Sequence, residues 1–431
     1  MRKGPVMKIG FVSTRFSGTD GVTLEARKWA EVLEEDGHRC FWFAGELPEG
    51  EQRGFLTPVA HFHDSRNVRL NSQIFGREKS SPKIIHEIHK QKAVLKTYIE
   101  NFVKLFEIDL LIVQNALSIP MNVPLGVALT EFIAETGIPT IAHHHDFCWE
   151  RSRFLKNGVR DLINRTFPPN LPNISHVVIN SDAQLELLQR KSIVSTVIPN
   201  VFNFEKEPGI DRARCRALRE ALGLTPEDIL FLQPTRVIER KGIKHAIELV
   251  KAIDPLRCKI VISHPAGDEG LEHLNWLKEY ATSLNVELIL ADNMVSDPNS
   301  AIDRNRMFSL QEMYQAADFV TYPSIYEGFG NALLEAIYFK KPVIINRYNI
   351  YVRDIAPKGF NLVEMDGKIT NGVVRNVKQI LRDAVRRKRV TNYNYEVARK
   401  HYSYAVLRER LPQIASGFIH SPCISPVCAT G

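Results

Sequence analysis

The chain has 431 residues, more than one hydrophobic core of ordinary size holds, so we expect two or three domains. Its composition, 44% hydrophobic and 24% charged, is typical of a folded globular protein and excludes a disordered one. The net charge of +7 suits anionic ligands. The positive charges are spread out, however, and no basic pattern interleaved with aromatic residues predicts a nucleic-acid partner.

Targeting and redox signals favour a cytoplasmic protein. We find no apolar run long enough for a transmembrane helix, and the start, Met1 to Pro5, leads directly into a strand rather than into a signal peptide. Met7 is as good a candidate for the natural start as Met1. The six cysteines show no metal-ligand spacing, so we expect reduced thiols.

Short apolar runs followed by turns predict strands that alternate with helices. In the first half, strands are expected at 8–14, 40–44, 110–113, 140–142, 177–180 and 196–198, and helices at 22–35, 125–135 and 183–189. In the second half, strands are expected at 229–233, 259–263, 288–290, 319–322 and 343–346, with helices ending near 253 and 339. This alternation predicts parallel sheets with right-handed crossovers.

The order of elements predicts an α/β protein with two Rossmann-like, doubly wound domains that face one another across a cleft. The polar stretch 203–216 is typical of a connection. We therefore expect an N-terminal domain at 1–202 and a C-terminal domain at 203–393. An amphipathic helix at 394–415 is expected to pack back on the first domain, and 416–431 to form a disordered tail.

The segment from Glu327 to Glu335 carries the sharpest chemical signal. Gly328 and Gly330 let a ligand approach the backbone, and the amides from Asn331 onward begin a helix that points N–H groups at an anion. Glu335 falls one helical turn further on, where its carboxylate suits the vicinal diol of a ribose. The alternative is a capped helix with two unrelated acids, but the two acids, two glycines and preceding strand favour function.

A second signal is Arg236 with Lys241, which are separated by a turn that follows a strand. A planar guanidinium and a mobile ammonium together suit a diphosphate, although two solvated cations are the plain alternative. The chain contains no Asp-x-Asp, so we expect these cations to neutralise a leaving diphosphate without a metal ion.

A third signal is the run His143, His144, His145 and Asp146, directly after a strand. Side chains alternate in an extended segment and no Glu or Cys partner is evident, which argues against zinc. We expect His145 to contact a sugar hydroxyl. The predicted acceptor-binding residues, for which surface ion pairs are an almost equal alternative, are His144, Asp146, Trp149, Arg151 and Arg153.

These segments, in this order, resemble glycosyltransferase family 4. The stretch Glu327 to Glu335 resembles the family's E-x7-E signature, Arg236 to Gly242 its R-x4-K-G phosphate clamp, and His145-Asp146 its sugar-contacting histidine. The resemblance covers about residues 7 to 411. It implies a GT-B fold in which the N-terminal domain, 1–202, binds the acceptor and the C-terminal domain, 203–393, binds the nucleotide-sugar donor. It also implies retention of anomeric configuration, and a nucleotide diphosphate sugar as co-substrate with no cofactor or metal.

Carried over by position, the resemblance assigns Arg236 and Lys241 to the diphosphate, Glu335 to the ribose and Glu327 to the sugar. The catalytic set is then Glu327, His145, Arg236 and Lys241, and the donor-binding set adds Gly21, Gly328, Phe329, Gly330, Asn331, Ala332, Leu333 and Glu335. The chain departs from the family where Asp20-Gly21 replaces a usual Gly-Gly and Asn331-Ala332 a common Leu-Pro. The histidine run with Trp149-Glu150-Arg151 also resembles a subgroup that includes mannosylglucosylglycerate synthases.

The predicted activity is therefore transfer of a hexose from a donor of the GDP-mannose or UDP-glucose type. The predicted acceptor is a hydroxyl of a small, soluble, anionic compound such as glucosylglycerate. A membrane-lipid or polysaccharide acceptor, with peripheral membrane contact, and a non-catalytic nucleotide-sugar-binding protein remain as alternatives. A glycosidase is disfavoured because both acids lie on one loop–helix unit. The sequence leaves the nucleotide base and the oligomeric state open.

Overall fold

The computed structural model describes residues 6–18, 20–254, 256–264, 270–295 and 308–419. The chain forms two compact units: unit 1 comprises residues 1–199 and 405–431, and unit 2 comprises residues 200–404. The sequence had placed this boundary near residue 203. Of the tail predicted at 416–431, residues 416–419 belong instead to the last helix, and residues 420–431, with Cys423 and Cys428, lie outside the described residues.

Unit 1 contains a seven-stranded parallel sheet in the order β3-β2-β1-β4-β5-β6-β7. Its strands are β1 (Lys8–Val12), β2 (Arg39–Ala44), β3 (Gly54–Leu56), β4 (Leu110–Gln114), β5 (Thr140–His144), β6 (Ile174–Val178) and β7 (Ser195–Val197). Its helices are α1 (Gly21–Glu35), α2 (Ser65–Ile74), α3 (Pro82–Phe106), α4 (Val123–Thr136), α5 (Ser152–Leu155), α6 (Arg160–Thr166), α7 (Ser181–Lys191) and α15 (Tyr404–Ile419).

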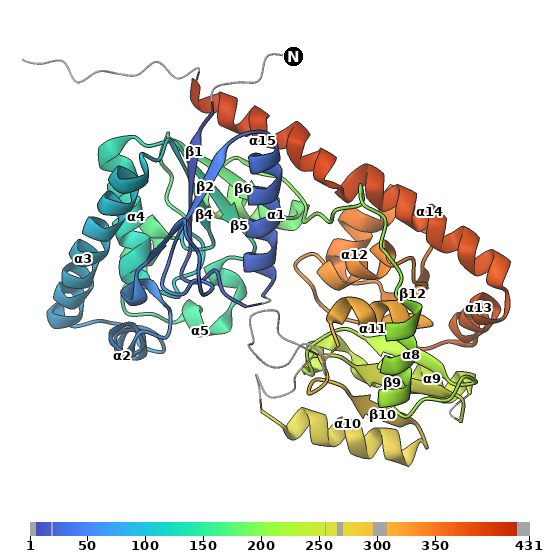
Figure 1. Ribbon diagram of the computed structural model, residues 1–431. Coiled ribbons are helices and arrows are strands. Elements are labelled where there is room, and N and C mark those ends of the chain that lie inside the picture. Colours follow the sequence, from blue (N-terminus) through green and yellow to red (C-terminus); the bar gives the residue numbers. More distant parts are fainter. Residues whose placement is uncertain (1–5, 19, 255, 265–269, 296–307, 420–431) are drawn as a thin grey trace, which may run out of the picture. The chain divides into compact units, whose positions relative to one another are not determined.

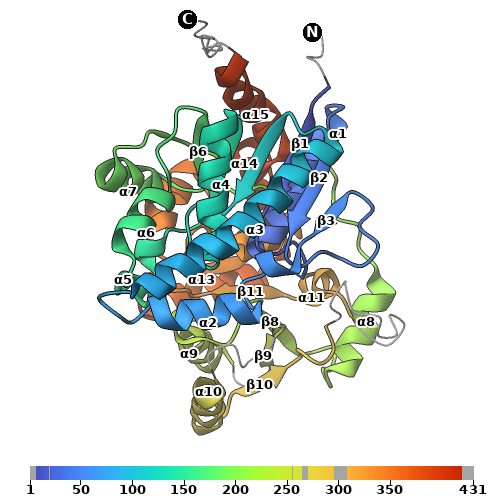
Figure 2. The ribbon, with the colours of Figure 1, turned by 90° about the vertical axis from the view of Figure 1, so that its left-hand side faces the viewer.

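Helices cover both faces of the unit 1 sheet, as buried parallel strands require. Figure 1 shows α3 and α4 on one side of the strands and α1 on the other, and in Figure 2 α3 crosses in front of them. The apolar face of α3, with Ile99 and Phe102, packs with Leu129 of α4 on Val113 of β4.

Unit 2 contains a six-stranded parallel sheet in the order β10-β9-β8-β11-β12-β13. Its strands are β8 (Ile229–Gln233), β9 (Cys258–Ile262), β10 (Glu287–Leu290), β11 (Phe319–Tyr322), β12 (Val343–Asn346) and β13 (Val363–Met365). Its α-helices are α8 (Arg212–Ala221), α9 (Ile243–Ile253), α10 (Glu272–Ser283), α11 (Leu310–Ala316), α12 (Asn331–Tyr338), α13 (Asn371–Arg382) and α14 (Ala384–Tyr402). None of the described helices is long and apolar enough to cross a membrane.

Each sheet reverses its strand order at one point, which is where doubly wound sheets bind ligands. In unit 1 the reversal lies between β1 and β4, and in unit 2 it lies between β8 and β11. The loops that follow these four strands are therefore the natural ligand-binding loops of the two units.

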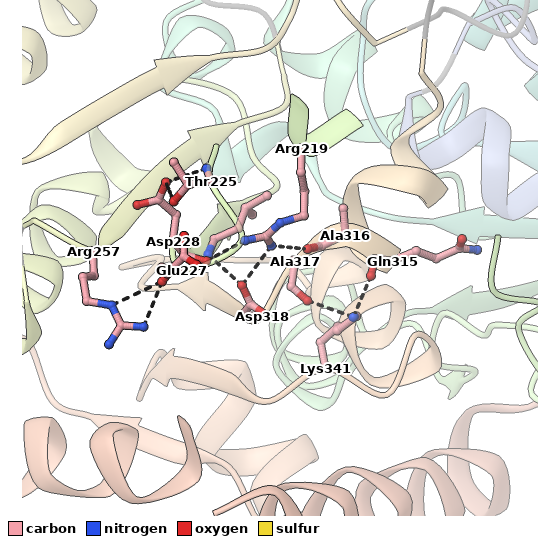
Figure 3. Close-up of polar contacts among 11 residues, drawn as sticks. Arg219, Thr225, Glu227, Asp228, Arg257, Gln315, Ala316, Ala317, Asp318 and Lys341 are labelled. Carbon is pink, nitrogen blue, oxygen red and sulfur yellow. Dashed lines mark hydrogen bonds and ion pairs between the residues drawn. The ribbon is translucent and has the colours of Figure 1, made fainter. Parts of the chain in front are cut away.

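A polar network fixes β8 and β11 at the opposite end of the unit 2 sheet (Figure 3). Arg219 of α8 donates to the Asp318 carboxylate at 3.0 Å and to the Ala316 carbonyl at 3.1 Å. The same Asp318 carboxylate accepts the Leu230 amide at 2.8 Å, and Lys341 donates to the carbonyls of residues 315 and 317 at 2.9 and 2.8 Å. These contacts hold the register from which the two site loops start.

The helices depart most from the sequence expectation. The helix expected at 394–415 is shared between α14 and α15, which are separated at Ser403, and α15 belongs to unit 1 from Ala405 on. The expected connection 203–216 ends inside α8, because Asp211 caps that helix by accepting the amides of residues 213 and 214. The 25-residue α3 and the short β3 and β13 were not predicted.

Candidate active site

The loops after β8 and β11 are locked together at the reversal point of unit 2. A Cβ on Gly242 would lie 2.2 Å from the Pro323 carbonyl oxygen, so only glycine permits this approach. The Ile325 amide donates to the Arg240 carbonyl at 2.8 Å. The two strongest sequence motifs are thus parts of one rigid surface.

Lys241 and Glu327 form a buried ion pair at the centre of this surface. The ammonium donates to Glu327 Oε1, and each residue is only 8% exposed. Arg240 Nη1 lies 3.4 Å from Glu327 Oε2 and donates to the Tyr326 carbonyl at 3.1 Å. The Tyr322 ring lies beneath, with its centroid 5.9 Å from Lys241 Nζ. The structure therefore brings these two predicted residues into direct contact.

Both groups of the pair have pKa values below their usual ones. Burial lowers the pKa of Lys241 against the attraction of Glu327, and Arg240 and Arg236 lower it further. Burial raises the pKa of Glu327, but the charge and hydrogen bond of Lys241, with the Arg240 charge, outweigh burial and bring the pKa below 4.5. Lys241, Arg240 and Arg236 together carry more charge than the Glu327 carboxylate, and the resulting net positive site suits a diphosphate.

The start of α12 presents its first turn at this site. Gly330 precedes the helix with a φ of 123°, and no side chain caps the helix there. The Tyr348 hydroxyl donates to the Phe329 carbonyl at 2.7 Å, and a Cβ on Gly330 would come within 2.6 Å of that hydroxyl. Asn200 Nδ2 donates to Asn331 Oδ1 at 2.7 Å. The helix start therefore has no capping side chain, and the Leu333 amide turns back to the Gly330 carbonyl at 3.0 Å, which leaves the first amides of α12 suited to a ligand that accepts hydrogen bonds.

Glu335 is half-buried one turn into α12, and its carboxylate is fixed in place. The hydroxyl of the buried Tyr314, from α11, donates to Glu335 Oε2 at 2.8 Å. The Phe329 and Leu333 side chains, in contrast, are 4% and 1% exposed and belong to the core, so any ligand contact there involves backbone.

His264 is a neighbouring residue that the sequence reasoning missed. It is the second residue after β9, and its Nδ1 lies 3.0 Å from the hydroxyl of the buried Ser263. Burial, with the charges of Lys241 and Arg236, lowers its pKa to about 4, so the ring is neutral near pH 7. Its place just after an apolar strand was the available signal.

In unit 1, His145 is held at the carboxyl end of β5 by residues of the β4 end. Its backbone amide donates to Asn115 Oδ1 at 2.8 Å, and its Nε2 lies 2.9 Å from Gln114 Oε1. Burial and the Lys28 charge lower its pKa to about 4, against an opposing effect of Asp20. His145 is therefore a neutral, oriented side chain near α1.

The two preceding histidines point into the core. His143 is fully buried and stacks on Trp29 at 4.2 Å between ring centroids. His144, predicted to bind the acceptor, is 1% exposed, and its Nε2 lies 2.9 Å from His176 Nδ1. Among the described residues, no group of three His, Cys, Asp or Glu side chains is placed to hold a metal ion.

The remaining predicted acceptor residues form a polar segment around α5. Asp146 accepts from Asn115 Nδ2 at 3.0 Å and from Arg151 Nε at 2.6 Å. Trp149 donates to the Glu186 carboxylate. Arg153 is exposed, with its guanidinium carbon 4.6 Å from the centre of a neighbouring phenyl ring.

Gly21, predicted to approach the donor phosphates, is the first residue of α1. The carboxylate of Asp20 already accepts the Val22 and Thr23 amides at 3.1 Å each. This helix start therefore carries its own anion, unlike the start of α12.

Comparison with known proteins identifies the family. Residues 216–397 match the model of the group 1 glycosyl transferases. The mannosylglucosylglycerate synthase of Petrotoga mobilis is 35% identical, over 84% of this chain and 87% of its own length. That of Thermotoga maritima is 34% identical, over 95% of this chain and 99% of its own length. The chain belongs to this glycosyltransferase family.

Solved glycosyltransferases share the fold. The complex of Anabaena Alr3699/HepE with UDP and glucose has a TM-score of 0.62 at 16% identity, over 95% of this chain and 99% of that one. Sucrose-phosphate synthase of Thermosynechococcus elongatus has a TM-score of 0.65 at 14% identity, over 96% of this chain and 99% of that one. The expected GT-B fold and hexosyltransferase family are thus confirmed.

Proposed function

We propose that this glycosyltransferase transfers mannose, or a closely related hexose, from a nucleotide diphosphate sugar to a hydroxyl of glucosylglycerate or a similar small anionic acceptor. The observation that carries the proposal is the similarity, over 84% and 95% of the chain, to two proteins named mannosylglucosylglycerate synthase. Family membership makes the chain a hexosyltransferase, and those two names supply the substrate class.

The donor half of the proposal rests on unit 2. Arg236, Arg240 and Lys241 supply positive charge, and the start of α12 supplies amides, so the diphosphate is assigned to this surface. The tyrosine-held carboxylate of Glu335 suits the ribose diol. Glu327, held on Lys241 and therefore charged at neutral pH, is assigned to the hydroxyl groups of the donor sugar.

The proposed reaction retains the donor configuration and uses no metal. The bond from sugar C1 to the phosphate oxygen breaks, and its electron pair stays on that oxygen. The acceptor hydroxyl oxygen bonds to C1 from the same face, and its proton moves to the leaving phosphate. Lys241 and the neighbouring arginines stabilise the charge that develops on this phosphate, which is the role a divalent cation plays elsewhere. Neutral His145 is assigned to a sugar hydroxyl.

A donor-by-acceptor screen tests this function. Purified protein is incubated with GDP-mannose, UDP-glucose or ADP-glucose, each with glucosylglycerate or with a phospholipid or polysaccharide acceptor, and released nucleotide is measured. We expect release that depends on glucosylglycerate and on one donor. Release that requires the lipid or polysaccharide would replace the proposed acceptor, and donor binding without turnover would support a non-catalytic protein.

A further inference from the structure

The arginines near the carboxyl edge of the unit 1 sheet differ in how many of their N–H groups already donate a hydrogen bond to the protein. Arg151 binds Asp146 through both Nε and Nη2. Arg66 likewise binds the two oxygens of Asp64 through Nε and Nη2, at 3.1 Å each. Each of these guanidinium forks is already filled by a carboxylate of the protein.

Arg15 lies at the reversal point of the sheet on rigid backbone. It comes three residues after β1, where strand pairing continues: the Ser13 amide donates to the Phe43 carbonyl at 3.1 Å, and the Phe16 amide to the Glu46 carbonyl at 2.9 Å. Arg15 is therefore held as if on a strand, although it lies in the first ligand-binding loop.

The guanidinium of Arg15 is only partly used. Its Nη2 donates to Asp20 Oδ2 at 3.1 Å, and its side chain remains 34% exposed. Asp20 also accepts the amides of Val22 and Thr23 and the Thr23 hydroxyl at 2.8 Å, so its charge is shared. Within the described part of the chain, Nε and Nη1 of Arg15 make no hydrogen bond. A cation with an open fork faces solvent here.

A stacked ring fixes the plane of this guanidinium. Its carbon lies 5.3 Å from the centre of the Phe62 ring, which stacks on His61 at 4.4 Å. His61 in turn pairs with Glu46 at 3.1 Å. A Cβ on Gly45 would lie 2.1 Å from the His61 nitrogen, so this segment packs directly on the end of β2. The fork is oriented before a ligand arrives.

We infer that Arg15 binds the carboxylate of the acceptor. The inference rests on the proposed function, because it takes the acceptor to be a sugar linked to a hydroxy acid. Asp20 uses one N–H of Nη2, so a carboxylate can still bind two parallel N–H groups on the other edge of the fork. Arg15 and His145 follow β1 and β5, at the same edge of the unit 1 sheet, and Asp20, the partner of Arg15, also acts electrostatically on His145, the residue assigned to a sugar hydroxyl. Arg153, the sequence-predicted alternative, is exposed on the short α5.

Paired acceptors test this assignment. Transfer to glucosylglycerate is compared with transfer to glucosylglycerol, in which an uncharged CH2OH replaces the carboxylate. Arg15→Met keeps an apolar stem on Phe62 and removes the charge. We expect it to raise KM for glucosylglycerate by roughly 10- to 100-fold, the effect of one charge-assisted hydrogen-bonding group, while kinetics with glucosylglycerol and KM for the donor stay within about twofold. Arg15→Lys keeps the charge, so its KM for glucosylglycerate should lie between the values of the wild type and of Arg15→Met.

Two matched variants complete the test. Arg66→Met removes a guanidinium that a carboxylate of the protein already occupies, so the kinetics of transfer to either acceptor should not change. Arg153→Met should leave the preference for the charged acceptor intact. An equal loss with both acceptors in Arg15→Met and Arg15→Lys, or a preference lost in Arg153→Met instead, would overturn the inference while leaving the proposed function standing. If the wild-type protein uses neither acceptor, the proposed function fails and the assignment of Arg15 fails with it.

Discussion

Variants of the Lys241–Glu327 pair most clearly separate an effect on catalysis from an effect on stability. Lys241→Met removes the ammonium and leaves the Glu327 carboxylate buried, with Arg240 at 3.4 Å as its remaining cation. Removing one member of a buried pair costs about 3 to 5 kcal/mol. Attraction to the half-exposed Arg240 offsets at most about 1 kcal/mol of this cost, so we expect the free energy of unfolding to fall by about 3 kcal/mol.

The double variant should recover most of this stability. In Lys241→Met with Glu327→Gln no uncompensated charge is buried, and we expect a free energy of unfolding within about 1 kcal/mol of the wild type. Together with the Glu327→Gln single variant, the two changes should therefore show a coupling of at least about 2 kcal/mol in a double-mutant cycle. Activity behaves differently: we expect the single and double variants alike to lose at least about 100-fold in kcat, because phosphate stabilisation is gone in both.

Thermal unfolding and steady-state kinetics at pH 7 measure the two effects. A loss of 3 kcal/mol should lower the Tm of unit 2 by about 6 to 12 °C. Lys259→Met is the matched control, because Lys259 pairs at 2.7 Å with Glu287, whose side chain is 55% exposed, and should cost less than about 1 kcal/mol. A double variant as unstable as Lys241→Met, or one with near-wild-type kcat, would refute the reasoning.

Four further results are expected. Glu335→Gln should weaken nucleoside diphosphate binding by roughly 10-fold in calorimetry and leave pyrophosphate binding unchanged, because Glu335 is assigned to the ribose; an equal loss for both ligands would contradict that role. Gly330→Ala should destabilise unit 2 by about 1 to 3 kcal/mol in denaturant titration, because its Cβ would meet the Tyr348 hydroxyl. Gly372→Ala in α13, where a Cβ has room, should be neutral or stabilise by up to about 1 kcal/mol. The buried histidines of β5 and β6, His143, His144 and His176, have pKa values below 6.5, so the unfolded chain binds more protons than the folded chain between pH 6.5 and 4. The Tm should therefore hold above pH 6.5 and fall below it, less steeply in His176→Asn, and a Tm that does not change with pH would contradict this. EDTA should leave the initial rate unchanged, and a rate restored only by added Mg²⁺ or Mn²⁺ would show a metal requirement.

The strands and their loops could be predicted from sequence because local pattern decides them. The strands at 229–233, 319–322 and 343–346 have the predicted bounds, since each is a short apolar run that ends at a turn. Function-bearing residues follow parallel strands directly, so Lys241 and Glu327 could be proposed together without any knowledge of their contact.

Partners that arrive from distant segments could not be predicted. The tyrosine that holds Glu335 comes from α11, and the ring under Arg15 comes from the segment before α2. The run of three histidines shows the same limit, because only the structure shows which rings face Trp29 and His176 in the core. Local sequence pattern identifies the side chains that lie at the end of a strand, whereas tertiary packing decides which of these side chains remain accessible to a ligand.

The configuration of the product tests the central claim most directly. Purified protein is incubated with GDP-mannose, glucosylglycerate and EDTA, and the disaccharide product is analysed by NMR. The account predicts a mannosylated glucosylglycerate in which the mannose keeps the α configuration of the donor. A β-linked product, or product that appears only when a divalent cation replaces EDTA, would contradict the proposed metal-free, retaining transfer.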